Sequence, residues 1–161
     1  DFLSDYASRE NLKSWMLTNY AHALGALKGV AGIEEAEQAI RYGLEIAPPG
    51  GSFNYLSSML APLEAAHGND EAAQYLIDTY YEDLTSRLTA YRKLAGLILM
   101  STPSAEKLDL KTEWQIFKIH FPEWKKDALM INYVEFAKQA ILKKGAKWYG
   151  GSVFLAKLLK R

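Results

Sequence analysis

Two segments of this sequence repeat each other at an offset of 36 residues. Gly32-Ile-Glu-Glu-Ala-Glu-Gln-Ala-Ile40 aligns with Gly68-Asn-Asp-Glu-Ala-Ala-Gln-Tyr-Leu76, and four of the positions are identical. Each copy joins an apolar segment to a glycine, two acidic residues and a second segment that contains alanine. Glycine permits the positive φ of a tight reversal, and acidic side chains favour a helix N-terminus. The repeat therefore predicts two antiparallel helical hairpins.

The remaining sequence is also expected to be helical. No stretch alternates with period two, and Ala, Leu, Glu and Lys dominate. In the first helix the apolar residues recur at steps of three and four, as on an amphipathic helix: Leu12, Trp15, Met16, Tyr20, Ala23, Leu24 and Leu27. The first expected helix runs from a cap at Ser4 or Ser8 to about Leu27, and the third from a cap at Ser52 or Asn54 to Ala66, with a kink or split caused by Pro62. The others span about 34–47, 70–100, where so long a helix can break near Thr85-Ser86, 103–120, 122–144 and 153–161.

The first copy resembles a tetratricopeptide repeat. The residues that carry this resemblance are Tyr20, Ala23, Leu24, Leu27, Gly32, Ala36, Ile40, Gly43 and Pro48. The second copy departs from the pattern, since Thr79 and Leu84 stand where the first copy has Gly43 and Pro48. The resemblance covers about residues 17–84. It implies an all-α fold in one domain, residues 1–161, in which the helices of residues 102–161 pack against two tetratricopeptide-like hairpins.

The resemblance also implies a protein-binding scaffold, because the first helix of each such repeat lines a concave surface. Carried over by position, the side chains expected on that surface are Thr18, His22, Lys28, Asn54, Ser57 and Glu64. These residues do not form the basic clamp with which some repeat proteins hold a partner's carboxylate.

The net charge of zero conceals two oppositely charged halves. Residues 1–83 carry 13 acidic and four basic residues, a net charge of −9, and residues 84–161 carry 15 basic and six acidic residues, a net charge of +9. This separation favours an acidic protein partner for the second half or self-association through the two halves. The residues expected to bind that partner are Lys138, Lys143, Lys144, Lys147, Trp148 and Tyr149. The alternative is nucleic-acid binding, with the two aromatic side chains stacking on bases.

Catalytic and cofactor motifs are scarce. The chain has no cysteine, three histidines (His22, His67 and His120), no HExxH spacing and no phosphate-binding loop. We therefore expect a non-enzymatic protein without a metal or cofactor, and we give low weight to an activity that uses His22 or His120.

Two features bear on where the chain resides. The longest apolar run, residues 94–100, is far shorter than the roughly 20 residues of a membrane span. The sequence begins at Asp1 without a signal-peptide pattern, so a cytoplasmic location is expected. The segment 153–161 is apolar with a cationic edge, and it is expected to close the helical bundle, with an anionic membrane surface as the alternative.

Overall fold

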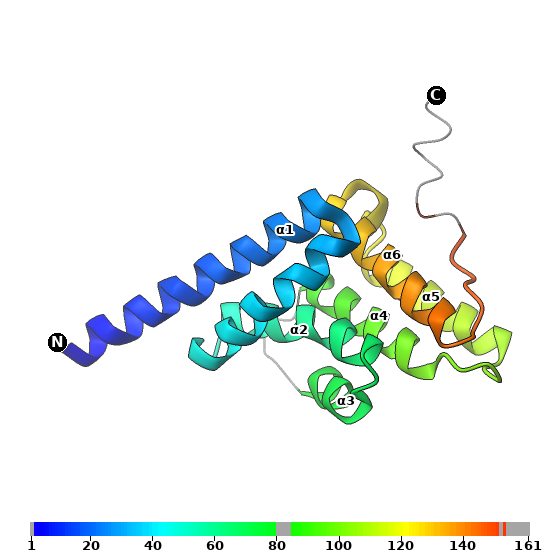
Figure 1. The fold of residues 1–161 in the computed structure, drawn as a ribbon, viewed down its shortest axis with the longest axis horizontal. Coiled ribbons are helices and arrows are strands. Elements are labelled where there is room, and N and C mark those ends of the chain that lie inside the picture. The colour runs from blue at the N-terminus through cyan, green and yellow to red at the C-terminus, as the bar shows by residue number, and fades with distance from the viewer. Residues whose placement is uncertain (1, 80–84, 152, 154–161) are drawn as a thin grey trace.

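The structure is a computed structural model that describes residues 2–79, 85–151 and 153. Within these residues the chain forms α-helices and one 3-10 helix but no strand, which confirms the expected all-α class (Figure 1). The helices are α1 (Phe2–Ile46), α2 (Gly51–Ala66), α3 (Asp70–Asp78), α4 (Ser86–Met100), α5 (Lys107–His120), η1 (Trp124–Lys126) and α6 (Ala128–Lys143). Of the expected last segment, 153–161, only Val153 lies among the described residues, and it is buried.

Helix α1 is broken at Gly29, which adopts φ 68° and ψ −145°. A φ of this sign is accessible to glycine at little cost. The first half of α1 (residues 2–28) therefore turns back into the second half (residues 30–46), and the two halves form a hairpin (Figure 1). Lys28 and Glu35 form an ion pair of 3.0 Å across the turn. The predicted reversal between Leu27 and the acidic residues is confirmed.

The two glycines that align in the sequence repeat have different roles. A Cβ on Gly32 would lie 2.0 Å from the carbonyl oxygen of Leu24, so this position packs directly against the backbone of the preceding half-helix. Gly68 instead lies in the turn between α2 and α3, with φ 80° and open space around it. The turn with positive φ in the first copy is at Gly29. Tetratricopeptide-type packing of the two hairpins remains a prediction.

Several expected helix boundaries differ from the observed ones. Pro62 does not split α2, which runs without interruption to Ala66. The break near Thr85 is confirmed, because the Thr85 hydroxyl accepts a hydrogen bond from the Leu88 amide and begins α4. Helix α6 begins after Asp127, whose carboxylate accepts a hydrogen bond from the Met130 amide at 2.9 Å. An N-cap of this kind fixes a helix start more strongly than a preceding proline does.

Helix α2 lies at the centre of the molecule. All its residues from Leu56 to Ala65 are buried, and it contacts α1, α3, α4 and α6. The expected packing of the C-terminal helices against the hairpins is observed where α6 contacts α1 and α2. The Asn132 amide on α6 donates to the carbonyl oxygen of Gly25 at 2.6 Å, and the Tyr133 hydroxyl donates to that of Met59 at 2.9 Å.

The first half of α1 buries an unexpected face. Ser14, Thr18 and Ala21 are buried together with Leu24 of the amphipathic pattern, whereas the other apolar residues of that pattern are exposed. The exposed fractions are 56% for Leu12, 56% for Trp15, 58% for Met16, 55% for Tyr20 and 85% for Leu27. The inner face of this half-helix lies close to α6, because a Cβ on Gly25 would lie 2.3 Å from the Leu129 side chain. A side chain larger than that of glycine does not fit at position 25, although Leu24 is accommodated beside it.

Candidate functional site

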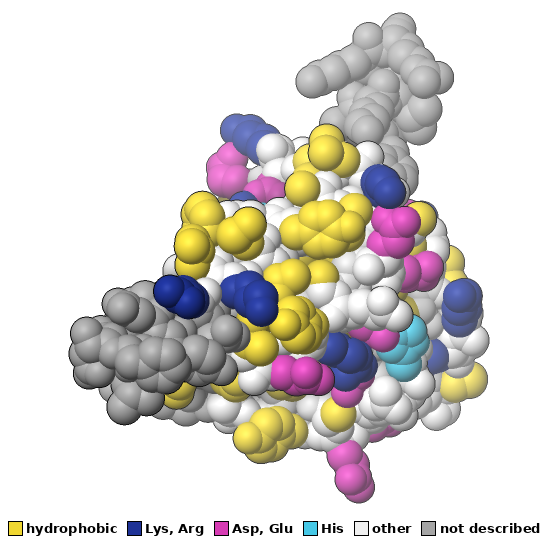
Figure 2. All heavy atoms as spheres, turned by 60° about the vertical axis from the view of Figure 1, so that its left-hand side comes forward, with side chains coloured by type: hydrophobic (Ala, Val, Ile, Leu, Met, Phe, Trp, Pro, Cys, Tyr) yellow, Lys and Arg dark blue, Asp and Glu magenta, His cyan; other side chains and the backbone are white. Residues whose placement is uncertain are grey.

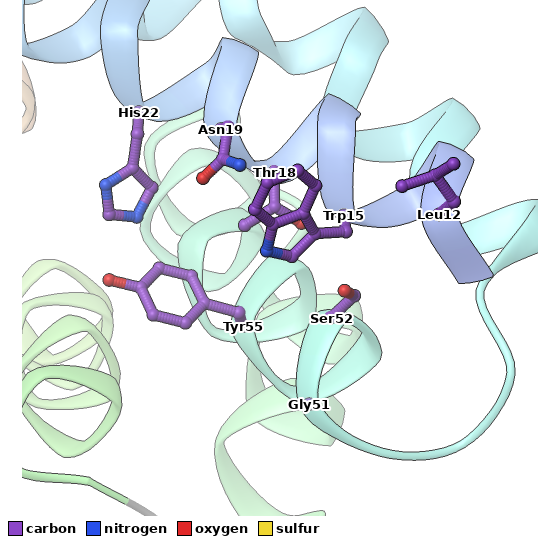
Figure 3. A pocket seen from close by; sticks show the side chains of 8 residues that line it. All are labelled: Leu12, Trp15, Thr18, Asn19, His22, Gly51, Ser52 and Tyr55. Atoms are coloured by element: carbon purple, nitrogen blue, oxygen red, sulfur yellow. The ribbon is translucent and has the colours of Figure 1, made fainter.

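The main candidate site is a groove of about 690 Å³ between the first half of α1 and the first turns of α2 (Figure 3). Five of its lining residues come from α1 and three from α2: Leu12, Trp15, Thr18, Asn19, His22, Gly51, Ser52 and Tyr55. The Trp15 and Asn19 side chains extend from α1 toward α2, and His22 faces Tyr55 at one end of the groove (Figure 3). None of the lining residues is acidic or carries a permanent positive charge.

Local sequence places these residues on facing surfaces. Positions three and four apart share one face of a helix, so Trp15, Asn19 and His22 project from α1 in the same direction. Pro48-Pro49-Gly50 ends the second half of α1 and allows α2 to begin at Gly51, which brings Ser52 and Tyr55 opposite that face. The groove is therefore formed by a helix face and a helix start.

His22 and Tyr55 form the polar end of the groove. Their ring centroids lie 4.7 Å apart with an interplanar angle of 49°. Burial, followed by the positive charge of Arg87, lowers the pKa of His22 below 6.5, and Asp127 opposes this effect. Burial raises the pKa of Tyr55 above 10.0. Both rings are therefore uncharged at neutral pH, and they offer ring faces and neutral hydrogen-bonding groups.

An ion pair between Arg87 and Asp127 supports this end of the groove. It joins the first turn of α4 to the N-cap of α6. Burial alone would raise the pKa of the Asp127 carboxyl, but the hydrogen bonds from Arg87 and the Met130 amide together with the charge of Arg87 outweigh burial, and the pKa is lowered. The ring centroid of Tyr91 lies 6.2 Å from that of Tyr55 and 4.7 Å from that of Tyr133. Tyr55 is thus supported by Tyr91 of α4, which packs in turn against Tyr133 of α6.

The other end of the groove exposes the N-terminus of α2. Gly50 occupies the N-cap position without a side-chain cap, and the first turn holds no acidic residue. The first intrahelical hydrogen bond at this end is donated by the Asn54 amide to the Gly50 carbonyl oxygen. A helix start without a cap presents unsatisfied N–H groups and the positive end of the helix dipole, so it favours an anionic group nearby.

The residues expected on a concave surface from the first copy have separate positions. Thr18 and His22 line the groove, although the Thr18 hydroxyl donates to the Ser14 carbonyl oxygen at 2.9 Å. Lys28 is exposed at the Gly29 turn, where it pairs with Glu35. His22, which the tetratricopeptide resemblance places on a concave surface, thus lies at a groove, and its contact with a partner remains a prediction.

The residues expected on that surface from the second copy do not line the groove. Asn54 is half-buried on α2. Ser57 is fully buried, and its hydroxyl donates to the Phe53 carbonyl oxygen at 2.8 Å. Glu64 is 6% exposed and pairs with Arg41. Ser57 and Glu64 thus belong to the interior, which corrects the expectation that they face a partner.

The lysines expected to bind a partner do not all lie free on the surface. Lys144 donates to the carbonyl oxygen of Ile98, in the last turn of α4, at 2.7 Å. Lys138 is half-buried, while Lys143 and Lys147 are exposed. Lysine side chains thus surround the end of α6, but one of them stabilises the end of a neighbouring helix.

The expected pair of exposed aromatic residues, Trp148 and Tyr149, is partly used by the fold. The Trp148 ring packs edge-on against Trp114 at 5.0 Å, and its indole N–H donates to the Gly151 carbonyl oxygen at 2.7 Å. The Tyr149 ring lies 5.8 Å from the Nζ of Lys107 and 5.9 Å from that of Lys111. Trp148 is therefore not free to stack on a base, which corrects the expectation of exposure for this residue.

Sequence reasoning missed most of the groove. The sequence places Trp15 in the apolar pattern of a helix, and it contains no signal that Ser52 or Tyr55 lines a groove. The available signal was the recurrence of Trp15, Asn19 and His22 on one helix face, which combines an aromatic ring with an amide and an imidazole.

Two searches of the described part of the chain gave negative results. Among the side chains that the structure describes, those of residue 9 and of residues 12–79, 85–151 and 153, no group of three or more His, Asp or Glu is placed to hold a metal ion. Among the same residues, no helix has the length and apolar character needed to cross a bilayer. Comparison with protein-family models, with curated proteins and with solved structures found no match for this chain.

Proposed function

We propose that this protein is a non-enzymatic helical interaction module that binds an acidic segment of a partner protein in the groove between α1 and α2. The observation that carries the proposal is the groove itself. It combines a volume of about 690 Å³ with the apolar surfaces of Leu12, Trp15 and Tyr55. Trp15 is 56% exposed, and an accessible tryptophan beside a cavity is a frequent anchor for a partner protein.

The acidic character of the partner is inferred from the electrostatics of the groove. A carboxylate near Gly51 and Ser52 would meet the uncapped N-terminus of α2 and would face no acidic lining residue. An aliphatic or aromatic side chain a few residues away along the partner would then contact Trp15 and Leu12. The Asn19 amide can bond to the backbone of a bound segment, since it offers both a donor and an acceptor.

Selection from a displayed random-peptide library tests this proposal. The immobilised chain is expected to enrich peptides that carry Asp or Glu close to a large apolar residue. Trp15→Ala is expected to weaken the selected peptides at least about tenfold, as loss of an aromatic anchor does. Ser52→Asp is expected to weaken acidic peptides about three- to tenfold while supporting α2, because its carboxylate competes for the helix N-terminus.

The matched control is Leu108→Ala, which removes a side chain that is 74% exposed on α5, outside the groove. It is expected to leave peptide binding unchanged. Failure to enrich any peptide, or binding that Trp15→Ala does not weaken, would contradict the proposal. Circular dichroism of each variant separates a loss of binding from a loss of fold.

The second candidate function is nucleic-acid binding by the basic C-terminal half. The observation that favours it is the position of Lys107 and Lys111 beside the Tyr149 ring, with Lys147 exposed nearby in the sequence. Binding to phosphates weakens as a steep power of the salt concentration. Absence of binding to single-stranded DNA or RNA at low salt would exclude this function.

A further inference from the structure

We propose that a second copy of this chain pairs with the outer side of α1 in an antiparallel, two-fold symmetric arrangement. The pairing surface, called here the outer stripe, consists of Leu12, Met16, Tyr20, Ala23 and Leu27. This inference does not rest on a partner in the groove, because four of the five stripe residues do not line it and only Leu12, at the border of the two surfaces, belongs to both. It also differs from an association of oppositely charged halves, since the surface is apolar.

No described element covers the outer stripe, although Leu12 at its end also lines the groove next to α2. All five residues are exposed, with Leu27 at 85% and the other three large side chains between 55% and 58%. Figure 2 shows hydrophobic side chains gathered on the face that α1 contributes to the molecule. Single exposed apolar residues are normal on a protein surface, but a contiguous row along one helix is typical of an interaction surface.

The spacing of the stripe suits pairing with another helix. Its residues follow one another at steps of four, four, three and four, which keeps them on one side of a helix over about four turns. Knobs-into-holes packing between helices uses steps of this kind. In the second half of α1, Tyr42 is also 43% exposed, and Lys13 donates to its hydroxyl at 3.3 Å. Tyr42 thus extends the apolar surface sideways.

A second copy matches the stripe because the stripe is complementary to itself when reversed. If Tyr20 meets Tyr20 of the partner at the two-fold axis, Met16 lies opposite the small residue Ala23, and Leu12 lies opposite Leu27. Met16 then faces a small residue on each side of the axis, which permits the two helices to approach closely there. Symmetric dimers generally form by such isologous contact of one surface with itself.

The exposed area corresponds to a small, weak interface between two copies. Leu12, Met16, Tyr20, Leu27 and Tyr42 together expose on the order of 600 Å² of residue surface, against about 800 Å² per partner in a standard interface.

The shape of the molecule favours the antiparallel orientation. The first half of α1 extends to one side of the other helices, so reversal places the bulk of the two copies at opposite ends of the paired helices (Figure 1).

Cysteine cross-linking tests the arrangement directly, because the chain contains no cysteine. Paired helices about 8–10 Å apart bring the Cα atoms of facing residues within the range of a disulfide. Tyr20→Cys alone is therefore expected to form a covalent dimer on mild oxidation. Leu12→Cys alone and Leu27→Cys alone are expected to stay monomeric, whereas their equimolar mixture is expected to form the mixed dimer. Leu108→Cys, on exposed α5, serves as the collision control.

The cross-linking results distinguish the alternatives. Efficient dimers of Leu12→Cys alone and Leu27→Cys alone would indicate a parallel pair and overturn the proposed register. If Tyr20→Cys cross-links no faster than Leu108→Cys, the stripe does not pair with a second copy.

Sedimentation equilibrium gives an independent readout. The unmodified chain is expected to have a mass that rises toward that of a dimer at concentrations up to about 0.5 mM, since association follows mass action. Tyr20→Asp is expected to raise the dimer dissociation constant at least about tenfold, because it places a charge at the symmetry axis. Leu108→Asp is expected to leave it unchanged. A chain that is monomeric throughout, or a dimer insensitive to Tyr20→Asp, overturns the inference.

Discussion

Replacing Gly32 with alanine perturbs the hairpin of α1 at its tightest point. The new Cβ would lie 2.0 Å from the carbonyl oxygen of Leu24 and 2.8 Å from the Cβ of Lys28. Real Cβ contacts do not come within 3.0 Å, so the two halves of α1 must separate by about 1 Å. The obstacle is backbone and not the end of a flexible side chain. No change of rotamer can therefore relieve the contact.

The size of the effect follows from two opposing terms. Forced separation of packed elements costs about 1–3 kcal/mol, and a backbone obstacle places this case near the upper end. Alanine also stabilises the helix by up to about 1 kcal/mol relative to glycine, because its helix propensity is higher, and this gain offsets part of the cost. We expect Gly32→Ala to lower the free energy of unfolding by about 2 kcal/mol. For a chain of this length that corresponds to a decrease in Tm of about 4–8 °C.

Thermal and urea unfolding followed by circular dichroism measure this change, with Gly96→Ala as the matched control. Gly96 lies within α4, and a Cβ there meets nothing within 4 Å. The control is therefore expected to raise stability by up to about 1 kcal/mol through helix preference alone. If Gly32→Ala has the same Tm as Gly96→Ala, the close packing of the two halves of α1 is refuted.

Two further predictions concern charged groups. Arg41→Met is expected to lower the free energy of unfolding by about 1–3 kcal/mol, because it leaves the Glu64 carboxylate, 6% exposed, without its partner. Lys28→Met removes an exposed ion pair and is expected to change it by less than about 0.5 kcal/mol, as urea titration of both variants can show. Burial lowers the pKa of His22 in the folded chain below the ordinary 6.5. The unfolded chain therefore binds more protons at this residue than the folded chain does. The free energy of unfolding is expected to fall as the pH decreases from about 7.5 to about 5.5. His22→Gln is expected to reduce this fall in the urea midpoint, while His120→Gln, at an exposed position, is expected to leave it intact.

Boundaries set by local chemistry could be predicted from the sequence. The turn near Gly29, the end of the hairpin at Pro48 and the break before Ser86 all depend on residues close to one another in the chain. The start of α6 was placed too early, since Pro122 suits a first helical position. Asp127 competes for that role, and its hydrogen bond to Met130 prevails.

The buried face of α1 could not be predicted, because it depends on how closely other helices approach. Hydrophobicity alone favours burial of Leu12, Met16 and Tyr20, yet Ser14 and Thr18 are buried instead. At Gly25 the inner face meets the Leu129 side chain of α6 and the Ile33 side chain of α1 at distances that exclude a larger residue. Burial here follows available space more than hydrophobicity.

The groove depends on the same unpredictable geometry. His22 was expected at a surface or groove, but its neighbour Tyr55 lies on a different helix. Their contact requires the angle between α1 and α2, which is set partly at Gly43, where a Cβ would lie 2.6 Å from the Leu56 side chain. Gly43 can be identified in the sequence, but its close contact with Leu56 of α2 cannot, because that contact depends on the tertiary arrangement.

The hydrogen bond from Asn132 to Gly25 has a consequence for synthesis of the chain. The carbonyl groups of Gly25 and Ala26 lie where α1 breaks at Gly29, and the Asn132 amide bonds to both, at 2.6 and 3.5 Å. The donor follows Gly25 by 107 residues. A ribosome adds that many residues in roughly 5–20 s. During that interval the emerging hairpin has neither this amide nor the Leu129 side chain against it. Completion of the α1 turn therefore depends on the arrival of α6, and the N-terminal hairpin is a candidate for chaperone protection until then.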